Sequence, residues 1–298
     1  DEAALRANGT INADDTVVSP MNFEIPAGKL GEGFLRSDLI IFNIIAANAN
    51  NGWKRPIYFT SPFGELGFGQ FLRKDGLAYR LVPIVNNFPQ NNWTVDQTLR
   101  QAQVGGTQIR DNNIDTMYRN LMEKYRFGNA GKPGVYFDEE NRRHLLNIRA
   151  VFAEAAGNLA DAGKKEEAVK LLDRLGEGID TSNLPYAMVS RFSSHNTTGL
   201  LYLEAAYKAG RTDLADKIRA ALRKDITEQQ NYYDYLQSQR PELFGGTMAG
   251  TEVYYNETML RVLNAIEQRY APATTAPQTA PVERQAPSII NAPSKDTP

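Results

Sequence analysis

The sequence predicts an α+β protein in three parts: a small α/β module over residues 1–112, a helical hairpin region over residues 113–270 and a disordered tail over residues 271–298. Short β-branched and aromatic runs, typical of strands, occur in the first part. Apolar residues spaced three and four apart, typical of amphipathic helices, dominate the second. The tail carries six prolines among Ala, Thr and Ser, so it has too few large apolar groups to offset its chain entropy by burial.

The first module contains one apolar run and two predicted strands. The run Leu39–Ala47 (LIIFNIIAA) follows Ser37-Asp38, a pair suited to an N-cap. Periodicity leaves a fully buried helix or a central strand open, and we favour a short buried helix. A bilayer span needs about 20 apolar residues, so this run is too short to cross a membrane. The tetrad Ile57–Thr60 and the run Leu77–Val85 predict strands.

The second part reads as a series of helices, and two of its hairpins look alike. In both, a glycine (Gly163, Gly210) ends one helix and an alanine five positions later (Ala168, Ala215) allows close packing of the next. This resembles the helix–turn–helix of tetratricopeptide (TPR) repeats. The 47 residues from Gly163 to Gly210 exceed the usual 34 or so, which fits an inserted loop around 185–196. The predicted helices cover residues 114–125, 145–162, 168–175, 200–207, 214–222 and 259–270.

Composition and motifs indicate no self-contained catalytic centre. The formal charge of −2, from 33 basic and 35 acidic residues, argues against nucleic acid as a partner. The chain has no cysteine, which excludes disulfides, thiolate metal sites and a cysteine nucleophile. Its two histidines, His144 and His195, lack metal-ligand spacing, and neither a nucleophile elbow nor a phosphate loop occurs. We therefore predict no catalytic residue, no metal site and no cofactor.

Two groups of residues are candidates for ligand or partner binding. Aromatic faces beside guanidinium groups suit sugars or phosphates, but packing explains the same residues more simply, with Trp53 filling a core and Lys54 and Arg55 extending from the end of a strand. Clustered tyrosines suit either a binding surface or packing between helices. His195 lies in the predicted inserted loop. The candidates are Trp53, Lys54, Arg55, Tyr58, Tyr79, Arg80, His195, Tyr232 and Tyr233.

Several sequence blocks resemble a known family. The segments Leu35–Leu39, Asn51–Phe59 (NGWKRPIYF), Gly76–Pro83 (GLAYRLVP), Met117–Met122 and Val135–Asp138 are similar to the C-terminal region of multi-spanning membrane proteins from Bacteroidetes. Those proteins form a family of unknown function related to protein O-mannosyltransferases. The resemblance spans roughly residues 23–240. It implies a glycosyltransferase of the GT-C type, with a membrane domain using a polyprenyl-phosphate sugar and a soluble domain outside the cytoplasm.

The resemblance leads to a functional expectation. We expect a non-catalytic, periplasmic domain that assists acceptor or partner binding in cell-envelope glycosylation. Its expected partners are the membrane-embedded N-terminal portion of the same protein and an acceptor protein or glycan. No catalytic residue can be carried over, because the family's catalytic carboxylate lies in the membrane domain. Two alternatives stay open: a TPR-type interaction module without a role in sugar transfer, and a hydrolase of envelope polysaccharide.

Overall fold

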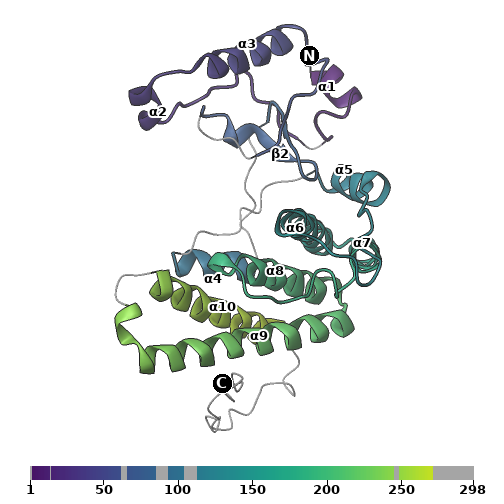
Figure 1. Cartoon of the computed structure of the whole chain (residues 1–298). Coiled ribbons are helices and arrows are strands. Elements are labelled where there is room, and N and C mark those ends of the chain that lie inside the picture. Colours follow the sequence, from purple (N-terminus) through teal and green to yellow (C-terminus); the bar gives the residue numbers. More distant parts are fainter. Residues whose placement is uncertain are drawn as a thin grey trace, which may run out of the picture.

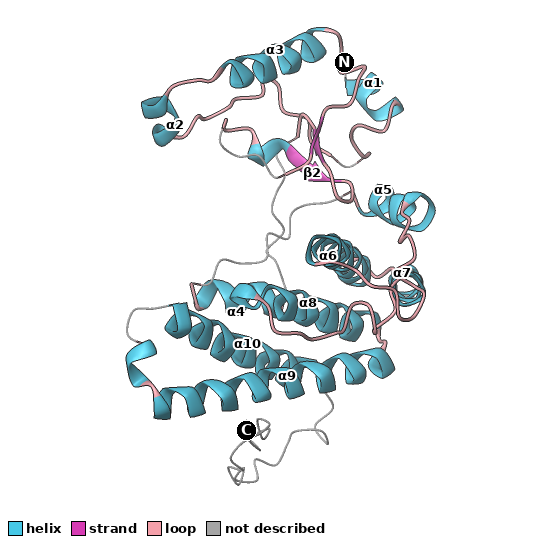
Figure 2. Cartoon of the chain, in the orientation of Figure 1, coloured by secondary structure: helices cyan, strands magenta, loops and turns pink. Residues whose placement is uncertain are grey.

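The computed structural model describes residues 2–13, 15–61, 66–84, 93–103, 113–244 and 248–270. In these ranges the chain is mainly helical and carries one small three-stranded sheet, which confirms the predicted α+β class (Figure 2). The predicted tail lies outside the described residues. The elements are α1 (Glu2–Ala7), α2 (Ala27–Glu32), α3 (Arg36–Asn50), β1 (Tyr58–Phe59), β2 (Leu72–Lys74), β3 (Tyr79–Leu81), α4 (Thr94–Gln101), α5 (Ile114–Arg119), α6 (Glu139–Asp161), α7 (Lys165–Gly178), α8 (Ser194–Ala209), α9 (Thr212–Gln239) and α10 (Met248–Tyr270).

The sheet has the strand order β1-β3-β2 and is antiparallel. β1 and β3 fall inside the two predicted strand runs, whereas β2 lies where no strand is predicted. The β2–β3 hairpin is closed by a hydrogen bond from the Asp75 N–H to the Ala78 carbonyl (3.0 Å). Gly76 in this turn has φ +137°, and a Cβ there would lie 2.6 Å from the Tyr125 hydroxyl, so both backbone and space require glycine.

Two small apolar clusters hold the N-terminal region together. The first lies between α3 and the sheet, where Phe23 meets two members edge-on, Phe68 at 5.8 Å and Phe71 at 5.5 Å between ring centroids. The second joins α1 to the segment after β3. The buried members of the first are Ile45, Leu66, Phe68, Phe71, Leu72 and Leu81, and those of the second are Leu5, Ile11, Val82 and Ile84.

Helix α3 confirms the predicted helix but not its burial. The helix spans Arg36–Asn50, and Asp38 stabilises its start by accepting a hydrogen bond from the Leu35 N–H (2.9 Å). Only Asp38 and Ile45 are buried in it, while Ile40 is 58% exposed. The expectation of a fully buried helix is therefore wrong. The physical reason is that the small sheet covers one face of α3 and the opposite apolar face has no described neighbour to cover it.

The helical region is built on the hairpins α6–α7 and α8–α9, with α10 packed against α8 and α9 (Figure 1). Gly163 and Gly210 follow the first helix of each hairpin with φ near +80° (+79° and +81°), and Ala168 and Ala215 are fully buried. Both features agree with the sequence prediction, because a left-handed residue ends a helix and a small residue admits its neighbour. One large cluster, extending in sequence from Trp93 to residue 266, forms the core.

Helix α4 belongs to this core although it lies within residues 1–112. Its preceding residue, Trp93, is 2% exposed and lies over Gly157 of α6, where a Cβ would approach the indole ring to 2.1 Å. The buried Glu204 carboxylate accepts hydrogen bonds from the N–H groups of Thr94 (2.7 Å) and Val95 (2.9 Å). A carboxylate at the positive end of a helix is stabilising. The boundary at residue 112 stays a prediction, and α4 packs on α8 and α10.

The two regions meet where the β2–β3 hairpin lies against α6 and the segment after α5. Lys74 of β2 forms a buried ion pair with Glu154 of α6, with 2.6 Å between Nζ and Oε2. The Tyr125 hydroxyl accepts a hydrogen bond from the Leu77 N–H (2.6 Å), and the Asn120 amide donates to the Asp75 carbonyl (2.9 Å). The junction is therefore held by polar contacts.

Candidate functional site

The residues of the WKRPIYF block do not converge on one site. Trp53 is half-buried and packs against both N-terminal clusters. Lys54 and Arg55 are exposed, and the Asn48 side chain holds the Arg55 backbone through two hydrogen bonds (2.6 and 3.2 Å). Trp53 also lines an apolar groove of about 800 Å³ between α1, α3 and residues 17–23.

The strand residues form a separate contact. Tyr58 and Arg80 are paired across β1 and β3, with the guanidinium carbon 5.9 Å from the phenol ring centroid. Arg80 donates to the Gly9 carbonyl (3.1 Å) and the Thr10 hydroxyl (2.8 Å), so it ties the chain after α1 to the sheet. Tyr79 is the preceding residue in the strand and packs against the first cluster instead. The contact between Tyr58 and Arg80 and the hydrogen bonds of Arg80 to the chain after α1 explain the arrangement of these two side chains without a ligand.

The remaining candidates lie in two other places. His195 is 2% exposed, and its Nε2 lies 2.8 Å from the Pro185 carbonyl. Desolvation lowers the pKa of His195 to about 4, so the ring is neutral at neutral pH and Nε2–H donates this bond. Tyr232 is 59% exposed on α9, with the Tyr233 ring 5.4 Å from its own. Tyr232 is available at the surface and Tyr233 is half-buried, and both lie far along the chain from the WKRPIYF block.

A group of exposed apolar side chains in the N-terminal region was not a candidate from sequence. It comprises six large side chains of α2, α3 and the turn between them, each 42–64% exposed, and we call it the α2–α3 face: Leu30, Phe34, Leu35, Leu39, Ile40 and Ile44. Figure 1 shows this stretch on the side of the molecule away from α6–α10. A contiguous apolar patch on a protein surface marks an interaction site more often than a single exposed leucine does.

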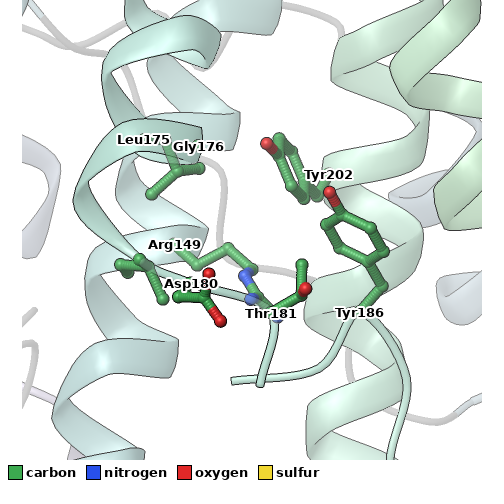
Figure 3. A pocket seen from close by; sticks show the side chains of 8 residues that line it. Arg149, Leu175, Gly176, Asp180, Thr181, Tyr186 and Tyr202 are labelled. Carbon is green, nitrogen blue, oxygen red and sulfur yellow. The ribbon is translucent and has the colours of Figure 1, made fainter. Parts of the chain in front are cut away.

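A small polar pocket lies in the helical region. It has a volume of about 200 Å³ and is lined by residues of α6, α7, α8 and the loop after α7 (Figure 3). We call it the Arg149 pocket after its most buried charged residue, which is 2% exposed. Its lining residues are Arg149, Leu175, Gly176, Ile179, Asp180, Thr181, Tyr186 and Tyr202.

Among the described residues, the guanidinium group of Arg149 has no carboxylate as an ion-pair partner. It donates to the carbonyls of Leu184 and Pro185, the latter at 2.6 Å. Its carbon lies 5.8 Å from the ring centroid of Tyr186 and 6.0 Å from that of Tyr202, and aromatic faces attract cations. Desolvation lowers the pKa of Arg149 to about 10, so the group stays charged at neutral pH. No ion pair joins it to a carboxylate of the described residues.

The Pro185 carbonyl accepts hydrogen bonds from both Arg149 and His195, which fixes the loop between α7 and α8. Asn196 also holds this loop in place, because its side chain accepts a hydrogen bond from the Met188 N–H (3.1 Å) and donates one to the Asp225 carboxylate (2.7 Å). His195 thus acts as a positioning residue for the wall of the pocket. From the sequence this histidine is a candidate, but Arg149 is not. Nothing in the sequence distinguishes Arg149 from any other arginine on an amphipathic helix.

Two further features bear on what the chain can do. The described residues contain no group of three or more metal-ligating side chains suited to hold an ion. In the same ranges, no helix combines the length and apolar character of a membrane span.

Comparison with known proteins relates one part of the chain to a family. A protein-family model described as TMEM260-associated domain 2 matches residues 1–102, about a third of the chain, a segment that includes the α2–α3 face but not the Arg149 pocket. This supports the coarser part of the expected resemblance, a TMEM260-like family related to protein O-mannosyltransferases. It does not bear on TPR repeats, on the GT-C type or on a source in Bacteroidetes. No curated protein and no solved structure matches the chain.

Proposed function

We propose that this chain is a non-catalytic, extracytoplasmic accessory domain of a GT-C-like membrane glycosyltransferase. It docks on the membrane-embedded portion of the same protein through the α2–α3 face and assists acceptor or partner binding in cell-envelope glycosylation. The observation that carries the proposal is the location of this uncovered apolar face inside the segment that matches a TMEM260-associated domain.

The energetics favour a covered face. Fully burying a leucine, isoleucine or phenylalanine side chain contributes about 1.5–3 kcal/mol. The six side chains of the face are roughly half exposed, so a partner that covers them gains on the order of 1 kcal/mol from each. Such a surface is costly to leave in water, and an apolar surface of the membrane-embedded portion that lies outside the bilayer would cover it.

Photo-crosslinking in the native membrane protein tests the docking. A photoreactive phenylalanine analogue replaces Ile40, which is 58% exposed on the face, and in a matched control replaces Tyr136, which is 86% exposed in the loop before α6. We expect crosslinks from position 40 to the membrane-embedded portion and none from position 136. Crosslinks from neither position, or the same products from both, would contradict the docking.

A second measurement tests the role in glycosylation. The double variant Leu39→Asp/Ile40→Asp places charges on the face, and Val189→Asp places one at a position that is 62% exposed in the helical region. We expect the first to lower glycosylation of envelope acceptors at unchanged protein abundance, and the second to leave it unaltered. Normal glycosylation in the first variant, at normal abundance, rules out the accessory role.

The alternative of a TPR-type interaction module rests on the two matched hairpins, α6–α7 and α8–α9. A stable protein partner recovered with the chain, together with normal glycosylation in the face variant, would favour this alternative.

A further inference from the structure

The geometry points to the Arg149 pocket as a binding site for a carboxylate-bearing sugar, that is, a uronic acid residue of a glycan. This inference does not depend on the docking of the α2–α3 face, because the pocket lies outside the matched segment.

The first step is the charge of Arg149. Two other cationic side chains are buried among the described residues, and each pairs with a carboxylate: Arg73 with Asp15 at 2.7 Å and Lys74 with Glu154 at 2.6 Å. Arg149 instead bonds two backbone carbonyls, which use two of the five N–H donors of a guanidinium group. A buried cation without a counter-ion is unfavourable, so a carboxylate entering the pocket would be strongly favoured.

The second step is the set of polar groups around the guanidinium. The hydroxyls of Thr181, Tyr186 and Tyr202 form no hydrogen bond with another described residue, although Tyr202 is 2% exposed. Asp180 supplies a carboxylate, and hydrogen bonds from Ser182 lower its pKa, so it is ionised and accepts at neutral pH. Three hydroxyls and one carboxylate match the hydroxyl groups of a sugar ring, which both donate and accept.

The third step separates a sugar from an acidic peptide. The negative charge of Asp180 opposes the carboxylate of a peptide and that of a uronic acid alike, because both would share the small pocket with it, so the distinction depends on the other groups that each ligand offers. A uronic acid places its carboxylate at Arg149 and turns hydroxyl donors toward Asp180. The two tyrosine rings, with centroids 6.1 Å apart, provide apolar walls for the ring carbons.

The surroundings leave room for a longer glycan. Gly176 and Tyr202 also line a neighbouring hollow of about 310 Å³ that ends at Arg211. Arg211 is itself paired with Asp173 and Asp213, and Glu177 adds a carboxylate to the lining, so this hollow offers acceptors for hydroxyl groups. A neutral sugar next to the uronic acid fits this arrangement.

The test measures binding to the full chain by NMR titration. The probes are D-glucuronate, D-glucose and a triglutamate peptide. We expect glucuronate to shift the amide signals of Gly176 and Tyr202, and glucose and the peptide to bind at least about tenfold more weakly. No shift with glucuronate at millimolar concentration overturns the inference, and so does equal or tighter binding of the peptide.

Variants sharpen the test without removing the buried arginine, on which the loop depends. Tyr186→Phe removes a hydroxyl and keeps the ring, and Asp180→Asn keeps the acceptor used by Ser182. We expect Tyr186→Phe to weaken glucuronate binding by about three- to tenfold, and Asp180→Asn to raise the preference for glucuronate over glucose, because it relieves the repulsion of the bound carboxylate, with folding unchanged in both. Tyr136→Phe, exposed and outside the pocket, should bind as the wild type does. Unchanged affinity in Tyr186→Phe, together with an unchanged preference in Asp180→Asn, contradicts the assigned site.

Discussion

The N-terminal and helical regions stabilise themselves in different ways. The helical region buries one continuous apolar cluster shared by α4 and α6–α10. The N-terminal region relies on two small clusters around two- and three-residue strands, yet it keeps the six large apolar side chains of the α2–α3 face at its surface. A region with little core of its own does not leave such side chains in water for its own stability. The docking proposed for the α2–α3 face would account for this difference.

The largest expected effect concerns the junction of the two regions. Replacing Lys74 by Met leaves the buried Glu154 carboxylate uncompensated, and we expect the free energy of unfolding to fall by about 3–5 kcal/mol. The double variant Lys74→Met/Glu154→Leu should recover most of this loss in chemical denaturation. A single variant that loses less than about 1 kcal/mol would show that the regions do not depend on this pair.

A smaller effect is expected on the stability of the helical region as the pH changes, through the titration of His195. The pKa of His195 is about 4 in the folded chain, mainly through desolvation, and about 6.5 in an unfolded one. The unfolded state therefore binds more protons between these values, so the stability from neutral His195 is complete above pH 6.5 and is lost as the pH falls toward 4. Between pH 7 and pH 5 the loss amounts to about 2 kcal/mol.

Thermal unfolding at the two pH values checks this. In His195→Gln, which keeps a donor for the Pro185 carbonyl, the decline in melting temperature between pH 7 and pH 5 should be smaller than in the wild type. The control His144→Gln changes an exposed histidine of α6 and should keep the wild-type decline. Equal declines in all three proteins would mean that His195 is not the titrating group.

The smallest expected effect sharpens the description of α3. Ile40→Ala, on the exposed face, should change the free energy of unfolding of the isolated chain by less than about 0.5 kcal/mol. Ile45→Ala, in the same helix, removes a side chain that is 5% exposed and should cost about 2–5 kcal/mol. Chemical denaturation of the two variants measures both values. Similar losses would mean that the face is already covered within the chain.

The helices and hairpin turns could be predicted because their signals are local. Gly163 and Gly210 end helices through their own backbone conformation, and Ala168 and Ala215 lie on the buried face that the apolar spacing indicates. The burial of α3 could not be predicted in this way. An apolar run has the same pattern whether it is covered by its own chain or by another molecule.

The Arg149 pocket was missed for a different reason. Arg149 is buried because the loop after α7 returns over α6 and bonds it through Leu184 and Pro185, 35 and 36 positions further along the chain. Nothing in the local pattern of α6 reports that contact. His195 was selected for its loop position, yet its role follows from the same carbonyl of Pro185, which only the three-dimensional arrangement brings to it.

The uncovered face of α3 also has a consequence for natural variation. Surface positions of a protein usually accept charged and polar replacements freely, but Leu39, Ile40 and Ile44 would not if a neighbour covers them in the cell. Homologous chains should then exchange these residues among Val, Met, Leu and Phe, while exposed sites such as Tyr136 drift without restriction. This restriction on substitutions would persist even though these side chains add nothing to the folding of the chain by itself.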